Sequence, residues 1–246
     1  MNHLFTVKSA LLFCLLAGTS VWSATTITLN QQQLTYEDTP PRLAEIIAPI
    51  AFDAQWYWSA SRLYRLNPTA ETLSQQQQAL VLLARLKDAA NAEEQWIFEA
   101  LAKDIATWPL AERIAIDIDY DRARANSAAN PRFEPGQYQL TLEPRPDYVW
   151  LVGAVNIKTK MAHKAATAVS QYGLDSYYTA LADTQRIYII QPNGKVIETG
   201  LQSWNASHVE VMPGSVIFVP FATGVFSSEL AELNALLLAL VVNRIY

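Results

Sequence analysis

The chain has 246 residues, of which 51% are hydrophobic and 17% are charged, and this composition excludes collagen-like and disordered chains. Its 18 Lys and Arg against 23 Asp and Glu give a formal net charge of −5. No basic surface of the kind that neutralises phosphates dominates such a molecule, so nucleic acid is not an expected partner. The length allows one large or two small domains.

The N-terminal segment has the layout of a secretory signal peptide. Lys8 precedes an apolar run over residues 10–18, and small and polar residues follow. Val21 and Ser23 suit the two positions read at cleavage, so we expect a signal peptide over residues 1–23; cleavage before Val21 is the main alternative. The only cysteine, Cys14, then leaves with the peptide. A lipoprotein cysteine there is disfavoured, because bulky Phe13 stands where a small residue is needed.

The exported part of the chain begins with alternating and then helical patterns. Residues 27–36 predict a hairpin around a polar turn, and residues 42–52 predict a short helix. Residues 74–108 predict an antiparallel helical hairpin, with capping boxes at Ser74 and Asn91 and a stop at Pro109. From Arg113 to residue 121 the apolar period is two, which predicts a half-buried strand with its acidic residues exposed.

The second half shows a similar sequence of short elements. Pro144 and Pro146 bracket a predicted domain boundary. The expected elements are strands over residues 148–155, 187–190, 196–201, 209–212 and 216–221 and a short helix over residues 176–182.

A C-terminal helix is expected over residues 227–246. Its middle, residues 235–242, is apolar on all sides, so it must be buried somewhere. Leu237 and Val241 are its candidate contacts with the body, a partner helix or a membrane. Only eight consecutive residues are apolar, which is too few to span a bilayer. We therefore expect membrane contact only if the helix is released from the body of the protein. We expect the helix to fold back onto the body of an isolated monomer.

No motif identifies a catalytic, cofactor or metal site. Asp117, Asp119 and Asp121 have the spacing of a calcium loop, but Arg122 replaces the required glycine. Asp117 and Asp119 as a glycoside-hydrolysing pair remain an alternative that rests on spacing alone. His163 and His208 lack metal-ligand spacing, and no nucleophile elbow or phosphate-binding glycine loop is present.

One aromatic and basic cluster is a candidate polysaccharide contact. Its members are Trp56, Trp58, Arg62 and Arg65, beside Tyr57 and Tyr64. Indole faces can stack on sugar rings, and guanidinium groups bind carboxylates through two hydrogen bonds. Core or interface packing of the same aromatic residues is the competing interpretation.

Three segments resemble the GfcC family of capsule-biosynthesis proteins from Gram-negative bacteria. They are RPDYVWLVGAV from Arg145, YIIQPNGKVIETGLQSWNASHVEVMPGSVIFVPF from Tyr188, and RIAIDIDYDRARANSAANPRFEPGQYQL from Arg113. The most specific part is Trp204-Asn205, His208-Val209 and Pro213-Gly214-Ser215.

The resemblance implies an α+β fold with two β-grasp domains and a C-terminal amphipathic helix. We place the first domain at residues 24–145 with the helical hairpin inserted at 74–108, and the second at 146–225. The resemblance also implies a relation to the β-grasp (SLBB-like) domains of Wza-type outer-membrane polysaccharide exporters, and it marks Arg113 as a candidate functional position. The expected function is that of a periplasmic, non-enzymatic accessory protein in capsule or exopolysaccharide export, with polysaccharide or export machinery as partners. A carbohydrate-active enzyme and a purely structural partner of an export complex are the alternatives.

Overall fold

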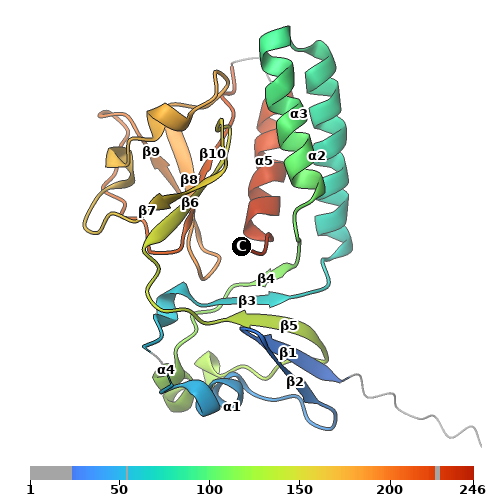
Figure 1. Ribbon diagram of the computed structural model, residues 1–246, viewed down its shortest axis with the longest axis vertical. Coiled ribbons are helices and arrows are strands. Elements are labelled where there is room, and N and C mark those ends of the chain that lie inside the picture. Colours follow the sequence, from blue (N-terminus) through green and yellow to red (C-terminus); the bar gives the residue numbers. More distant parts are fainter. Residues whose placement is uncertain (1–23, 54, 225–227) are drawn as a thin grey trace, which may run out of the picture.

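The protein is a mixed α+β molecule built on two five-stranded sheets, as shown by a computed structural model that describes residues 24–53, 55–224 and 228–246 (Figure 1). The predicted α+β class is therefore confirmed. The predicted signal peptide lies outside the described residues. Within the described part of the chain, no helix combines the length and the hydropathy needed to cross a bilayer.

The first sheet has the order β2-β1-β5-β3-β4. Its strands are β1 (Thr25–Leu29), β2 (Gln32–Tyr36), β3 (Arg62–Arg65), β4 (Glu112–Ile114) and β5 (Gly136–Thr141). β1 and β5 are parallel neighbours in the middle, and the other pairs are antiparallel. The expected hairpin at residues 27–36 is β1-β2, and its turn places Asn30 at a φ of 53°.

The second sheet repeats this arrangement with the order β7-β6-β10-β8-β9. Its strands are β6 (Tyr148–Gly153), β7 (Thr159–Ala162), β8 (Arg186–Ile190), β9 (Val196–Gly200) and β10 (Val216–Val219). Again the central pair, β6 and β10, is parallel and the others are antiparallel. Both sheets thus place their last strand beside their first.

Five α-helices and five short 3-10 helices complete the described chain. The α-helices are α1 (Leu43–Ile47), α2 (Ala70–Ala89), α3 (Ala92–Ala106), α4 (Tyr120–Ala125) and α5 (Ser228–Val242). The 3-10 helices are η1 (Ala48–Ile50), η2 (Trp58–Ala60), η3 (Ser127–Ala129), η4 (Val169–Gln171) and η5 (Leu174–Tyr177).

The helical hairpin α2-α3 packs with the second sheet, although it interrupts the first sheet in sequence. Figure 1 shows α2, α3 and α5 together beside the second sheet, whereas α1 and α4 lie on the far side of the first sheet. One continuous core joins Leu83 of α2, Ile105 of α3, Leu237 of α5 and Phe218 of β10. A smaller core joins α1 to the first sheet. The hairpin is therefore a structural part of the second half.

Several predicted elements differ from the observed ones in their boundaries or type. α2 begins at Ala70, because Thr69 accepts a hydrogen bond from the backbone N–H of Thr72 at 3.1 Å; Ser74 lies within the first turns. Residues 209–212 form no strand, and only Glu210 makes an isolated bridge, to Ala168. The helix expected over residues 176–182 is the earlier 3-10 turn η5.

The strand predicted from Arg113 to residue 121 is present only at its start, and its extension beyond Ile114 is wrong. β4 ends at Ile114, and α4 begins at Tyr120 because Asp119 caps it by accepting a hydrogen bond from Arg122 N at 2.8 Å. The apolar alternation continues through residues 115–119, but these residues pair with no strand. Alternation alone therefore did not show where the strand ends.

Candidate functional site

Arg113 lies at the junction between the two sheets. β3 and β4 are antiparallel, and their register places Tyr64 opposite Arg113. Because side chains alternate along a strand, Leu63 joins the core of the first sheet while Arg62 and Tyr64 face the junction. The guanidinium carbon of Arg113 lies 4.5 Å from the ring centre of Tyr64, and its Nη1 donates a hydrogen bond to the Tyr64 hydroxyl. The cation and the ring form a cross-strand pair.

The second sheet covers Arg113 from the other side with the turn between β8 and β9. Gly194 in that turn has a φ of +89°, and a Cβ added there would lie 3.2 Å from Cγ of Arg113. Both the backbone conformation and the close approach favour glycine. Gly194, the last residue of the Pro-Asn-Gly turn, therefore allows the two sheets to approach at this point.

Arg113 is a partly buried cation that has no acidic partner within hydrogen-bond or ion-pair distance among the described residues. Its Nε and Nη2 are buried and make no hydrogen bond there. Burial lowers the pKa of Arg113, Tyr64 opposes this shift, and the charge of Arg62 adds to it. The unused N–H groups of a guanidinium can donate hydrogen bonds to a carboxylate, to another oxygen acceptor or to water. Besides its contacts with Tyr64, Arg113 therefore offers two N–H groups to an acceptor.

The chain segment after α5 completes this junction. It runs beside residues 109–113, where Ala111 N donates to Asn243 O at 2.8 Å and Ile245 N donates to Pro109 O at 2.9 Å. The side-chain oxygen of Asn243 accepts from Arg113 N at 3.0 Å. No periodicity in the sequence could have predicted this contact, because it joins residues about 130 positions apart.

Aromatic side chains hold two further cations near the junction. Arg244 lies over Trp108, with its guanidinium carbon 4.5 Å from the ring centre, and 5.1 Å from the ring centre of Tyr246. Lys160 of β7 lies 4.1 Å from the ring centre of Tyr148. Cations stacked on aromatic rings from both halves therefore line this interface.

Arg62, a predicted polysaccharide contact, is buried and connects the two halves. It is 5% exposed. Its Nη1 donates to Glu143 Oε1 at 2.9 Å and its Nη2 donates to the Gly214 carbonyl at 2.6 Å. Glu143 also accepts from the Tyr148 hydroxyl at 3.1 Å. This network fixes the start of β3 to the second sheet and leaves Arg62 inaccessible to a polymer.

The other members of the predicted aromatic cluster do not form a shared platform with Arg62. Trp56 and Trp58 are half-buried against the core of the first sheet, and Trp56 Nε1 donates to Ile50 O at 2.7 Å. Arg65 remains partly exposed, 3.6 Å from Glu134 and with its guanidinium carbon 5.9 Å from the ring centre of Tyr138. These contacts favour the packing interpretation for part of each indole, and polysaccharide contact by Trp56 and Trp58 stays a prediction.

The remaining candidate residues have structural partners. Leu237 and Val241 are each 1% exposed within the core shared with the second sheet. Asp117 accepts a hydrogen bond from Asn193 at 2.8 Å and lies 3.5 Å from Arg122. Among the described residues, no group of three His, Cys, Asp or Glu side chains could hold a metal ion.

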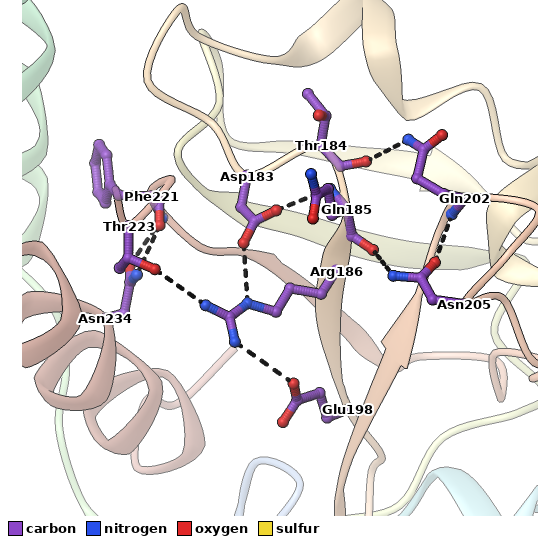
Figure 2. A network of polar contacts seen from close by, with 10 residues as sticks. All are labelled: Asp183, Thr184, Gln185, Arg186, Glu198, Gln202, Asn205, Phe221, Thr223 and Asn234. Atoms are coloured by element: carbon purple, nitrogen blue, oxygen red, sulfur yellow. Dashed lines mark hydrogen bonds and ion pairs between the residues drawn. The ribbon is translucent and has the colours of Figure 1, made fainter. Parts of the chain in front are cut away.

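A second polar network supports the loop that carries the Trp204-Asn205 motif (Figure 2). Asn205 donates to Gln185 O at 3.0 Å and accepts from Gln202 N at 2.9 Å. Beside it, Arg186 donates to Asp183 at 2.9 Å and to Thr223 at 3.2 Å. These contacts order the loop, while Trp204 itself is 73% exposed. The motif therefore combines a structural asparagine with an exposed indole.

The chain matches two family models that together span nearly all of it. Residues 20–145 match the model described as "Capsule biosynthesis GfcC, N-terminal", and residues 158–246 match "Capsule biosynthesis GfcC C-terminal". The chain is also 30% identical over 192 residues to the uncharacterized protein YjbG of Escherichia coli (strain K12), and this match covers 78% of each chain.

Proposed function

The chain belongs to the GfcC family of capsule-biosynthesis proteins, and on this premise we propose that it is a periplasmic, non-enzymatic accessory protein in capsule or exopolysaccharide assembly and export. The observation that carries the proposal is the pair of family matches, one over residues 20–145 and one over residues 158–246. The signal-peptide pattern before residue 24 supports periplasmic action.

Both sheets are assigned in this proposal to the β-grasp fold. Two features support the assignment: the first and last strands of each sheet are parallel neighbours in its middle, and both sheets have equivalent strand orders. The helical hairpin between β3 and β4 is then an insertion into the first unit, and it serves to enlarge the core of the second.

The protein acts in this proposal as a rigid adaptor that contacts the polymer or the export machinery. The buried Arg62–Glu143 pair and the segment after α5 both cross the junction, so the halves are suited to move as one body. The enzyme alternative is weakened, because Asp117 contacts Arg122 and Asn193 while Asp119 caps α4, and these contacts give both carboxylates a structural role.

Deletion and complementation in the producing bacterium test the function. We expect loss of the chain to reduce surface polysaccharide, and a plasmid copy to restore it. The Asp117→Asn and Asp119→Asn variants should also restore it, because an accessory role involves no catalysis by either carboxylate. Unchanged polysaccharide in the deletion strain would contradict the proposed function. Failure of an abundant, folded Asp117→Asn variant would instead favour an enzyme.

A further inference from the structure

A partly open pocket lies where α3 meets the end of β6. Its volume is about 250 Å³, and it is lined from α3, from β6 and the loop after it, and by Phe221. Gly153 in this wall has a φ of +104°, and a Cβ there would lie 2.1 Å from the carbonyl oxygen of Val219. Only glycine allows the β6 and β10 backbones to approach so closely at this point.

One side of the pocket is aromatic and apolar. Trp96 on α3 lines it and is 48% exposed, whereas the apolar side chains of Ile97, Phe98 and Ile105 on the same helix are buried in the core. Trp108, Val152 and Phe221 form the more buried lining. A large indole kept half in solvent beside an apolar hollow gives a ligand a flat surface for stacking.

The polar part of the lining consists of Asp104, Asn156 and Lys158. Lys158 Nζ donates to Asp104 Oδ1 at 2.9 Å, and Arg244 lies 3.9 Å from Asp104 Oδ2. Asn156 is fixed in place by donating from Nδ2 to Tyr178 O at 2.9 Å. Asp104 and Lys158 are each about one-third exposed, so a ligand in the pocket can reach both.

We propose that this pocket binds one neutral pyranose ring of a polysaccharide. A pyranose has an apolar C–H face that matches the indole of Trp96, and hydroxyl groups that can donate to Asp104 and accept from Lys158. Within the lining the charges of Asp104 and Lys158 cancel, and Arg244, the second cation beside Asp104, is buried and lies outside the lining, so the pocket presents no unpaired charge to a sugar. The volume lies just below the range of about 300–1,000 Å³ that drug-sized ligands occupy, as suits a single ring.

The polar groups favour a sugar over an apolar side chain of a partner protein. An apolar side chain would displace water from Asp104 and Lys158 without replacing its hydrogen bonds, which costs free energy. Sugar hydroxyls replace them. The choice of a polysaccharide as source rests on the proposed function, whereas the pocket and its lining do not.

Binding by the purified mature chain tests the proposal. The probes are the oligosaccharide repeat released by mild acid from the exopolysaccharide of the producing strain, and a dextran oligosaccharide of equal length. Tryptophan fluorescence and saturation-transfer NMR measure binding at up to millimolar sugar. We expect saturable binding of the native repeat, and Trp96→Ala should weaken it by about tenfold to hundredfold, as loss of a stacking platform does. Lys158→Met should weaken it as well.

The matched control is Trp204→Ala, which removes an even more exposed indole outside this pocket. Its affinity should equal that of the parent chain. Thermal unfolding checks that all variants are folded; Trp96 is half exposed on a helix, so its replacement by Ala should be tolerated. No binding of either probe, or equal binding by Trp96→Ala, would overturn the proposal.

The outcomes separate the pocket from the proposed function. Capsule loss in the deletion strain without sugar binding by the chain would reject the pocket and leave an accessory role through protein contacts. Sugar binding that depends on Trp96, in a chain whose deletion leaves the polysaccharide unchanged, would support the pocket and reject the accessory function.

Discussion

The side-chain amide of Asn234 makes two hydrogen bonds to the backbone of Phe221, one to its N–H and one to its carbonyl, each 2.8 Å long. The amide thereby pairs with the chain just after β10 as a neighbouring strand would (Figure 2). Together with Leu233 and Leu237, which are buried in the same core, it fixes α5 to the second sheet. A helix whose second half is apolar is thus held in place by a specific polar contact as well.

Replacing Asn234 by Ala should lower the free energy of unfolding by about 2 kcal/mol, because both backbone groups of Phe221 lose their partner in a half-buried site. Asn234→Asp should be at least as destabilising, since a carboxylate oxygen would face the Phe221 carbonyl. Urea denaturation measures both changes. Unaltered midpoints would show that apolar packing alone holds α5.

A charge placed on the buried side of α5 should unfold the protein more readily. Leu237 is 1% exposed, so Leu237→Asp should cost about 3 kcal/mol or more through lost apolar burial and a buried carboxylate. Ala235→Asp, at an exposed position of the same helix, is the control and should leave the melting temperature nearly unchanged. Equal melting temperatures for both variants would mean that α5 is displaced in solution.

The two arginines of the junction should respond differently to replacement by Met. Arg62→Met should cost about 3 kcal/mol, because it leaves Glu143 without the cation that pairs with it. Arg113→Met should stay within about 1 kcal/mol of the parent chain, because the cost of burying its unpaired charge offsets the contacts it makes with Tyr64. Chemical denaturation of the two variants measures the difference. A larger loss for Arg113→Met than for Arg62→Met would contradict this reading of the junction.

Asp104 should contribute to the stability of the protein in a pH-dependent way. Burial alone would raise the pKa of Asp104, but its hydrogen bond with Lys158 and the charges of Lys158 and Arg244 outweigh this and lower it. A carboxyl with a lowered pKa stabilises the fold above its unfolded value of about 3.9, and this contribution is lost as the pH falls through the folded value. Between pH 7 and pH 3 the parent chain should lose more stability than Asp104→Asn. Parallel losses would show that the ion pair is energetically neutral.

The role of Asp119 as a helix cap can be separated from its charge. Asp119→Ala should lower the free energy of unfolding by about 1 kcal/mol, whereas Asp119→Asn should retain most of it because asparagine caps equally well. Thermal unfolding of the pair measures this. If the Asn variant is as unstable as the Ala variant, the charge of Asp119 matters more than the cap.

Local patterns were enough to predict several elements and their chemistry. The helices of residues 74–108, the first hairpin and the burial of Leu237, Leu240 and Val241 within residues 235–242 follow from the spacing of apolar residues, which depends only on a few neighbours in sequence. The same local reasoning failed at Asp119 and Thr69, where a single side-chain hydrogen bond decides where a helix begins. The family resemblance was likewise readable from contiguous motifs, and the family models confirm it.

The tertiary structure alone decided which surfaces these elements cover. A periodic apolar face indicates that a helix is buried, but it does not indicate against which element. That depends on contacts distant in sequence, and here the hairpin that interrupts the first sheet joins the core of the second. For the same reason Trp56 and Trp58 pack partly against the first core while Trp96 and Trp204 remain more exposed. Indoles are alike in sequence, and only the chain folded around each one determines whether it can meet a ligand.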